Sequence, residues 1–213
     1  MTTHREGLLG VLLAGGLSRR MGGGDKGLMP LGDKPLMQHS LERLRRMTGS
    51  AIINANGDPS RFSRFDAPIV PDTISGFAGP LAGVLAGMQY AQGHPRPPHF
   101  VVTAAADTPF FPETLADRLL AAQDQTDQIV LAQSDGRRHP VFGLWPVDLA
   151  EDLEEWLTSS EERKVLAWVD RHRWTTADFD DVTVGTERLD PFFNVNTPDD
   201  FARAQTLFES VEA

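Results

Sequence analysis

The 213-residue sequence contains no cysteine, which excludes disulfide bonds and thiolate metal sites. A bound metal ion must therefore use oxygen ligands or histidine. No apolar run approaches the roughly 20 residues that span a bilayer, so we expect no membrane association. The N-terminal segment MTTHREGLLG lacks a basic stretch followed by an apolar stretch and a cleavage site, so we expect no export signal. These absences fit a cytoplasmic protein.

An excess of positive charge is also absent. The formal net charge is −10, and it divides into +4 for residues 1–48, −4 for residues 49–150 and −10 for residues 151–213. Nucleic-acid binding needs a basic face that releases counterions, so we expect no nucleic-acid partner. A basic segment within an acidic protein instead indicates one small anionic ligand.

Apolar runs and amphipathic stretches alternate along the chain. With 40% hydrophobic residues, the chain is long enough to bury a core as one domain, residues 1–213. The sequence predicts strands at 8–13, 51–56, 68–72, 100–106, 128–133, 139–145 and 191–196, with an edge strand at 173–177, and helices at 34–47, from Pro80, at 115–123, within 147–170 and from Pro198. This order predicts an α/β fold, a single Rossmann-like domain whose mostly parallel sheet has helices on both faces.

The stretch Leu12–Lys26 combines glycines with Arg19, Arg20 and Lys26 directly after the first predicted strand. Glycines let the backbone approach a ligand closely, and a turn rich in free N–H groups binds phosphate oxygens. The spacing matches neither the Walker loop nor the dinucleotide fingerprint. The stretch therefore predicts a nucleotide phosphate loop of another kind. The alternative is a flexible loop with incidental basic residues.

Three other segments carry polar groups where strands end. Asn54 closes one predicted strand and is a candidate for binding a base or ribose, or else a turn asparagine that bonds its own backbone. Asp107 follows a buried strand and predicts a Mg²⁺ ligand, or else the cap of the next helix. His139 is a single histidine, more often structural or a substrate-pocket donor than a metal ligand.

Several of these pieces together resemble the molybdenum cofactor guanylyltransferase family. They are LAGG-x3-RMGG-x-DKG at 13–27, GPLAG at 79–83, Asp107-Thr108-Pro109, HPVFGLW at 139–145 and NVNTPDD at 194–200. The resemblance covers nearly the whole chain. It implies a nucleotidyltransferase that moves GMP from GTP to the terminal phosphate of molybdopterin and releases pyrophosphate. One departure is the triple glycine at 22–24, whose third position is usually not glycine in the family.

The resemblance also implies roles for individual residues. Arg19, Lys26 and Asp107 are the expected catalytic residues, and Asp107 is the expected Mg²⁺ ligand. The expected nucleotide-binding residues are Leu13, Ala14, Gly15, Gly16, Lys26, Asn54, Asp72, Gly79, Pro80, Leu81, Gly83 and Asp107. His139, Asn194 and Asn196 are expected on the acceptor or metal side. Residues 8–110 are the implied nucleotide-binding part, and residues 111–213 are the implied acceptor-binding part.

Other functions compete with this one. A cytidylyltransferase on the same cofactor, or another nucleotidyltransferase of this fold, shares the same motifs; Gly15-Gly16 and GPLAG favour guanine by resemblance alone. A non-catalytic nucleotide-binding protein predicts binding without pyrophosphate release, and the presence of Arg19, Lys26 and Asp107 together argues against it. The expected ligands are GTP and molybdopterin, and transient contact with molybdenum cofactor synthesis proteins is compatible with a protein-carried acceptor.

Overall fold

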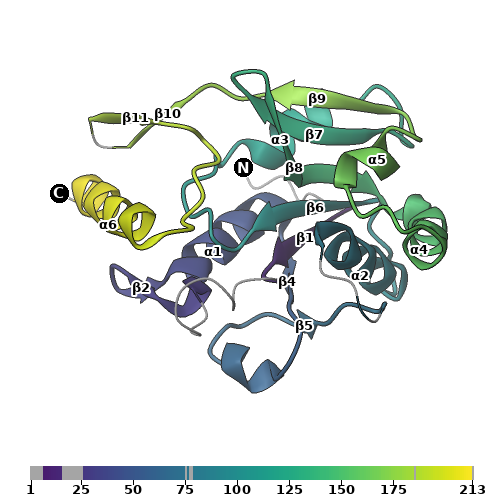
Figure 1. Ribbon diagram of the computed structural model, residues 1–213, viewed down its shortest axis with the longest axis horizontal. Coiled ribbons are helices and arrows are strands. Elements are labelled where there is room, and N and C mark those ends of the chain that lie inside the picture. Colours follow the sequence, from purple (N-terminus) through teal and green to yellow (C-terminus); the bar gives the residue numbers. More distant parts are fainter. Residues whose placement is uncertain (1–6, 16–25, 75, 77–78, 185, 213) are drawn as a thin grey trace.

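The centre of the protein is a seven-stranded sheet with the order β5-β4-β1-β6-β8-β7-β9 (Figure 1). The computed structural model describes residues 7–15, 26–74, 76, 79–184 and 186–212. The strands are β1 Leu8–Leu13, β4 Ala51–Asn54, β5 Ile69–Val70, β6 Phe100–Ala105, β7 Ile129–Ser134, β8 Arg137–Pro146 and β9 Trp174–Asp178. β8 is antiparallel to both of its neighbours, and the other strands run in parallel, which confirms the predicted mostly parallel sheet.

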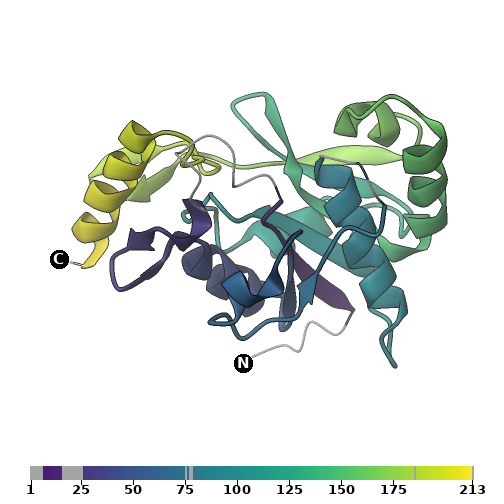
Figure 2. The same cartoon turned by 60° about the horizontal axis from the view of Figure 1, so that its bottom comes forward.

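Helices cover both faces of this sheet, as Figures 1 and 2 show. The helices α1 Leu36–Thr48 and α3 Leu115–Ala121 pack on one face, and α2 Pro80–Gln92, α4 Ala150–Ser159 and α5 Val165–Val169 pack on the other. Neighbouring residues of β6 pack on opposite faces of the sheet: Val102 belongs to the apolar cluster under α1, whereas Val101 belongs to the apolar cluster under α2. Because successive strand residues point to opposite faces, a strand buried on both sides reads as a continuous apolar run.

A third apolar cluster lies beside the sheet. It joins the hairpin of β2 Pro30–Leu31 and β3 Lys34–Pro35, the hairpin of β10 Val182–Val184 and β11 Glu187–Leu189, and the C-terminal helix α6 Pro198–Glu212. Leu31 and Leu207 are almost fully buried there. Both views place α6 next to the β2–β3 hairpin (Figures 1 and 2). Three 3₁₀ turns complete the described elements, η1 Lys26–Leu28, η2 Pro59–Phe62 and η3 Val147–Leu149.

The predicted strand from Pro191 onward is wrong. Residues 191–197 form a turn followed by irregular backbone, because Asp190 takes the local donors: its carboxylate accepts the N–H of Phe192 and its carbonyl accepts the N–H of Phe193. The β10–β11 hairpin was not predicted. The predicted edge strand at 173–177 is confirmed, because β9 ends the sheet.

Among the described residues, every helix is too short or too polar to span a bilayer.

We predict that Gly87→Ala destabilises the protein. A Cβ at this helical position would lie 2.5 Å from the Cγ2 of Val11, a fully buried and stiff β-branched residue of β1. Overpacking of this kind costs about 1–3 kcal/mol in free energy of unfolding, measurable by urea denaturation. Gly93→Ala is the matched control: the nearest atom to its added Cβ is 3.5 Å away, and we expect a change within about 0.5 kcal/mol. Equal stability of the two variants would contradict the prediction.

Candidate functional site

The candidate site forms where three adjacent parallel strands end. Leu13 of β1 lies opposite Asn54 of β4 and Ala105 of β6 in the sheet register. Beyond the strands the pairing continues for one residue, since Ala14 N–H donates to the Asn54 carbonyl and Ala106 N–H donates to the Leu13 carbonyl. The carboxyl ends of parallel strands are the usual position of ligands in open α/β sheets. The structure thereby brings Leu13, Ala14, Asn54 and Asp107 to one edge.

Asn54 is held in a fixed orientation. Its side chain is only 3% exposed, and its Nδ2 donates to the carbonyl of Val70 at 3.1 Å and to Oδ1 of Asp72 at 2.9 Å. Both donors of the amide are thus engaged, which leaves Oδ1 as its acceptor for a ligand. The predicted pair Asn54 and Asp72 therefore forms one unit.

Asn56 completes this unit and was not predicted as a site residue. Its Nδ2 donates to Oδ2 of Asp72 at 2.7 Å, and its Oδ1 accepts the backbone N–H of Asp72 at 2.9 Å. Both carboxylate oxygens of Asp72 consequently bond asparagine amides. The signal in the sequence is the spacing Asn54-x-Asn56 at a strand end, where two side chains of one face follow each other.

Two glycines lie near Asn54, and one of them, Gly83, packs tightly against it. A Cβ on Gly83 would lie 2.3 Å from Asn54 Oδ1 and 2.6 Å from Leu13 Cδ2, so only glycine fits at this point of α2. A Cβ on Gly15 would lie 3.9 Å from the same Oδ1. The first turn of α2, which begins with Gly79 and Pro80, therefore packs against the ends of β1 and β4. The side chain of Leu81 is buried in the core under α2, so it can offer a ligand little more than its backbone.

Asp107 occupies the end of β6. Burial raises the pKa of its carboxyl to about 6, against the opposing effects of a hydrogen bond from its own backbone and of the positive charge of Lys26. Its carbonyl accepts the N–H of Val195 at 2.9 Å, which ties the 194–196 segment to the end of this strand. A partly buried carboxylate with one nearby positive charge is a suitable ligand for a divalent cation.

Lys26 is buried and reaches the same segment. Its side chain is 6% exposed, its Nζ donates to the carbonyl of Asn196, and Nζ lies 3.5 Å from Asn196 Oδ1. An ammonium group has three donors, so the two acceptors found among residues 7–15, 26–74, 76, 79–184 and 186–212 leave one for a phosphate oxygen.

The start of α6 fixes the position of Asn196. The carboxylate of Asp200 accepts the N–H groups of Asn196 and Thr197, while the Thr197 hydroxyl accepts the N–H of Asp200 at 3.1 Å. This reciprocal arrangement is a capping box, as Thr197 followed by Pro198 predicts. The helix start therefore holds the carbonyl that binds Lys26.

Close to Asp107 in the chain, and close to Val195 whose N–H bonds its carbonyl, are two buried polar atoms without a hydrogen-bond partner among the described residues. They are Oγ1 of Thr108, which follows Asp107, and Oδ1 of Asn194, which precedes Val195. An unsatisfied buried polar atom costs roughly 1–3 kcal/mol, and such atoms are characteristic of functional sites. Their position supports the expected role of Asn194 near Asp107.

His139 lies in a different environment. It is 8% exposed, its Nε2 is 2.7 Å from Ser134 Oγ, and its ring packs on Phe192 with centroids 4.4 Å apart. Burial lowers the pKa of the imidazole. These contacts are those of a core histidine, and its role on the acceptor side stays a prediction. Gly16 and Arg19 lie outside the described residues.

Known proteins resemble this chain over most of its length. A family model described as MobA-like NTP transferase domain matches residues 10–174. A protein of Mesorhizobium japonicum named molybdenum cofactor guanylyltransferase is 47% identical over 208 residues, which cover 97% of this chain and 99% of the relative.

Solved structures share the fold. Molybdopterin-guanine dinucleotide biosynthesis protein A from Archaeoglobus fulgidus superimposes with a TM-score of 0.70 at 24% identity, over 95% of this chain and 98% of that one. Rv0371C from Mycobacterium tuberculosis, solved in complex with manganese, superimposes with a TM-score of 0.64 at 18% identity, over 94% of this chain and 98% of that one.

We predict that Asp107→Asn stabilises the protein free of metal and nucleotide. Because the pKa of this carboxyl is about 6 in the folded state and near 3.8 in the unfolded state, the unfolded chain loses its proton first as the pH rises. The contribution of this carboxyl to the free energy of unfolding of the wild type therefore falls between about pH 4 and pH 6, and it stays low at higher pH. The variant lacks this loss, so at pH 7 it should gain about 1–3 kcal/mol. Urea denaturation at pH 4, 5, 6 and 7 checks this; a difference independent of pH would contradict it.

We also predict that Asn56→Ala weakens nucleotide binding without unfolding the protein. Loss of its two bonds to Asp72 frees the carboxylate to rotate, which should weaken the affinity for GTP, the nucleotide that the resemblance implies, by about three- to tenfold. Isothermal titration calorimetry measures the affinity, and Arg64→Gln, at an exposed position of the same loop, is the control. Unchanged affinity in Asn56→Ala would show that Asp72 needs no second anchor.

Proposed function

The chain belongs to the MobA-like NTP transferase family, and from this premise we propose that it transfers GMP from GTP to the terminal phosphate of molybdopterin, with release of pyrophosphate. The guanylyltransferase of M. japonicum supports this activity through 47% identity over nearly its full length. In the structure, the supporting observation is one sheet edge that holds Asn54, Asp107 and the end of β1 together. Binding groups for a nucleotide and for a cation meet there.

The nucleotide would lie across the ends of β4 and β1. Asn54 and Asp72 supply a fixed acceptor and an anchored carboxylate, and the backbone of α2 packs tightly against Asn54 at Gly83. In this proposal Leu13, Ala14, Gly15 and Gly16 follow the nucleotide, and Gly79–Gly83 with Pro80 and Leu81 enclose the base. Guanine is the proposed base because the named relative is a guanylyltransferase.

Asp107 is the proposed ligand of a divalent cation, and Mg²⁺ is the ion we propose. Its fit rests on the partly buried carboxyl that follows β6; burial raises the pKa of this group, and Lys26 is the positive charge that opposes the shift. When bound, such a cation neutralises charge on the phosphates and on the departing pyrophosphate. The manganese complex of the M. tuberculosis structure with the same fold is compatible with an oxygen-ligand site of this kind.

The acceptor chemistry needs charge neutralisation more than proton transfer. A phosphate monoester has a second pKa of about 6, so it is mostly dianionic at neutral pH and needs no general base. Lys26, with one ammonium donor left over, would bind a phosphate oxygen, and Arg19 would approach the transferred phosphoryl group. Asn194 and Asn196 lie on the segment tied to Asp107 and would meet the acceptor. Delivery of molybdopterin by transient contact with its synthesis proteins belongs to the same proposal.

The activity is tested by pyrophosphate release from GTP and Mg²⁺ with molybdate-loaded molybdopterin as acceptor. Lys26→Ala, Asp107→Ala and Arg19→Ala should each lower turnover by about 10²- to 10³-fold, because clamping charges on a transferred phosphoryl group contribute at this scale. The exposed residues Lys164 and Asp66 provide matched controls, Lys164→Ala and Asp66→Ala, which should retain turnover. Circular dichroism confirms folding, and near-normal turnover of Asp107→Ala would remove the metal assignment.

Base selectivity separates this proposal from a cytidylyltransferase. Thermal shifts with GTP, CTP, ATP and UTP in the presence of Mg²⁺ should be largest for GTP. A preference for CTP would overturn the assignment of guanine while leaving the fold and the transferase chemistry intact. Nucleotide binding without pyrophosphate release, in the presence of acceptor, would instead indicate a non-catalytic binding protein.

A further inference from the structure

A cavity of about 450 Å³, apart from the candidate functional site, opens between α1, the segment Pro109–Thr114, β10 and α6. Neither Asn54 nor Asp107 lines it. Its lining residues on α1 place it on the side of the sheet that α1 covers. The proposed nucleotide and acceptor contacts leave this cavity without a role.

One wall of the cavity is apolar. Phe110 and Val184 are nearly buried in the third apolar cluster, and Val182 and Phe208 pack against that cluster. The ring of His39 meets Phe208 edge to face at 4.8 Å, and its Nε2 donates to the carbonyl of Leu31 at 2.8 Å, which holds the imidazole in place. This wall suits an aromatic or aliphatic group.

The opposite wall carries an incompletely compensated positive charge. Arg43 and Arg46, one turn apart on α1, share a single oxygen of Glu113: Arg46 Nη2 lies 2.9 Å and Arg43 Nη1 lies 3.5 Å from Oε1. Burial lowers the pKa of Arg43, so its charge is poorly solvated where it stands. Two cations on one carboxylate leave one positive charge for a second anion.

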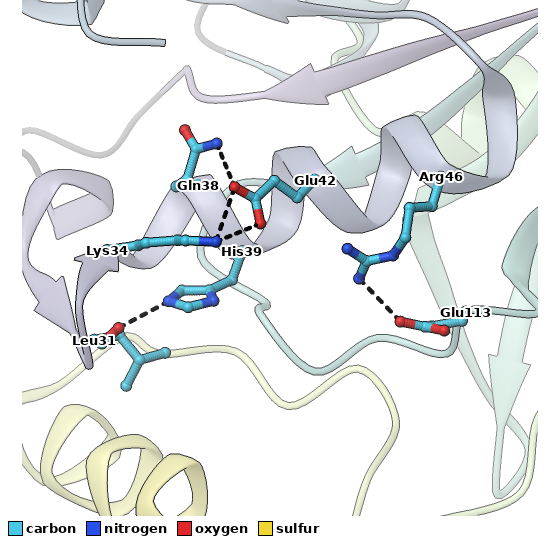
Figure 3. A network of polar contacts seen from close by, with 7 residues as sticks. All are labelled: Leu31, Lys34, Gln38, His39, Glu42, Arg46 and Glu113. Carbon is cyan, nitrogen blue, oxygen red and sulfur yellow. Dashed lines mark hydrogen bonds and ion pairs between the residues drawn. The ribbon is translucent and has the colours of Figure 1, made fainter. Parts of the chain in front are cut away.

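Glu42, the other acid in this cavity, does not provide that anion. Its carboxylate accepts from Lys34 at 3.0 and 3.2 Å and from Gln38 at 2.8 Å. Figure 3 shows Lys34 of β3 and Gln38 of α1 meeting Glu42, while Arg46 extends away toward Glu113. The charge of Glu42 is therefore balanced by Lys34, and the surplus stays on the two arginines.

We propose that this cavity binds a small amphipathic anion, with its carboxylate or phosphate at Arg43 and Arg46 and its apolar body against Phe110 and Phe208. A volume of about 450 Å³ lies in the range of small-molecule sites, which are mostly apolar with a few placed polar groups. The occupant would contact Pro109 and Phe110, which continue the strand end that carries Asp107. The proposal does not depend on the transferase activity.

Calorimetric titration with four probes tests the proposal. 2-Naphthoate and 2-naphthyl phosphate carry the two kinds of anion on one aromatic body, 2-naphthalenemethanol lacks the charge, and inorganic phosphate lacks the body. We expect at least one aromatic anion to bind, and its affinity to exceed that of the alcohol and of inorganic phosphate by about tenfold or more. The tighter of the two anions identifies the headgroup. Binding of neither anion, or equal binding of the alcohol, overturns the proposal.

Variants locate the bound probe. Arg43→Gln and Arg46→Gln should each weaken it by about ten- to hundredfold. Thr183→Trp, at an exposed position of β10 that lines the cavity, should block it without disturbing the core. Arg45→Gln is the matched control, since Arg45 pairs with Asp66 outside the cavity, and should change affinity less than about twofold.

The same titration with saturating Mg²⁺ and GTP separates this cavity from the proposed nucleotide site. Unchanged probe affinity supports the proposal, and displacement by GTP overturns it. Affinity that is the same in wild type, Arg46→Gln and Thr183→Trp also overturns it, because the probe then binds elsewhere.

Discussion

The parallel pairing of β4, β1 and β6 is the constraint on which the rest of the site depends. Because the three strands run the same way in register, their carboxyl ends place Asn54, Leu13 and Asp107 at one edge although they come from distant parts of the chain. Packing on both faces maintains that register: Val101 and Val102 belong to different clusters, so a slip by one residue would exchange the two faces of β6. The core and the site are therefore specified by the same pairing.

Two ionisable side chains, Asp107 and Arg43, lie where burial disfavours their charged forms. Asp107 and Arg43 are both partly buried, and Arg43 shares the carboxylate of Glu113 with Arg46. Burial raises the pKa of the Asp107 carboxyl and lowers the pKa of the Arg43 guanidinium. Groups of this kind destabilise an unliganded fold, and perturbed ionisable groups in protein structures concentrate at functional positions. In a protein of net charge −10, these two groups are the basis of the proposed cation and anion sites.

Local signals in the sequence predict the sheet and most helices, since apolar runs bounded by glycine or proline suffice for β1, β6 and α2. Thr197, Pro198 and Asp200 likewise predict the start of α6, and strand ends single out Asn54 and Asp107. The non-local contacts could not be predicted. Lys26 meets Asn196 across 170 residues of sequence, and no local pattern encodes this contact. The turn at Asp190, which replaces a predicted strand, depends on side-chain acceptors that periodicity does not register.

The capping box of α6 limits how far the C-terminus can be shortened without losing a contact of Lys26. The matched family region ends at residue 174, yet the carbonyl that receives the Lys26 ammonium belongs to Asn196 and is fixed by Asp200. A fragment cut at the family boundary would lose most of the edge strand β9 and would also remove Asn196, the hydrogen-bond partner of Lys26. The residues after 174 therefore help to position Lys26, and exchanging them between relatives would change the surroundings of this ammonium group.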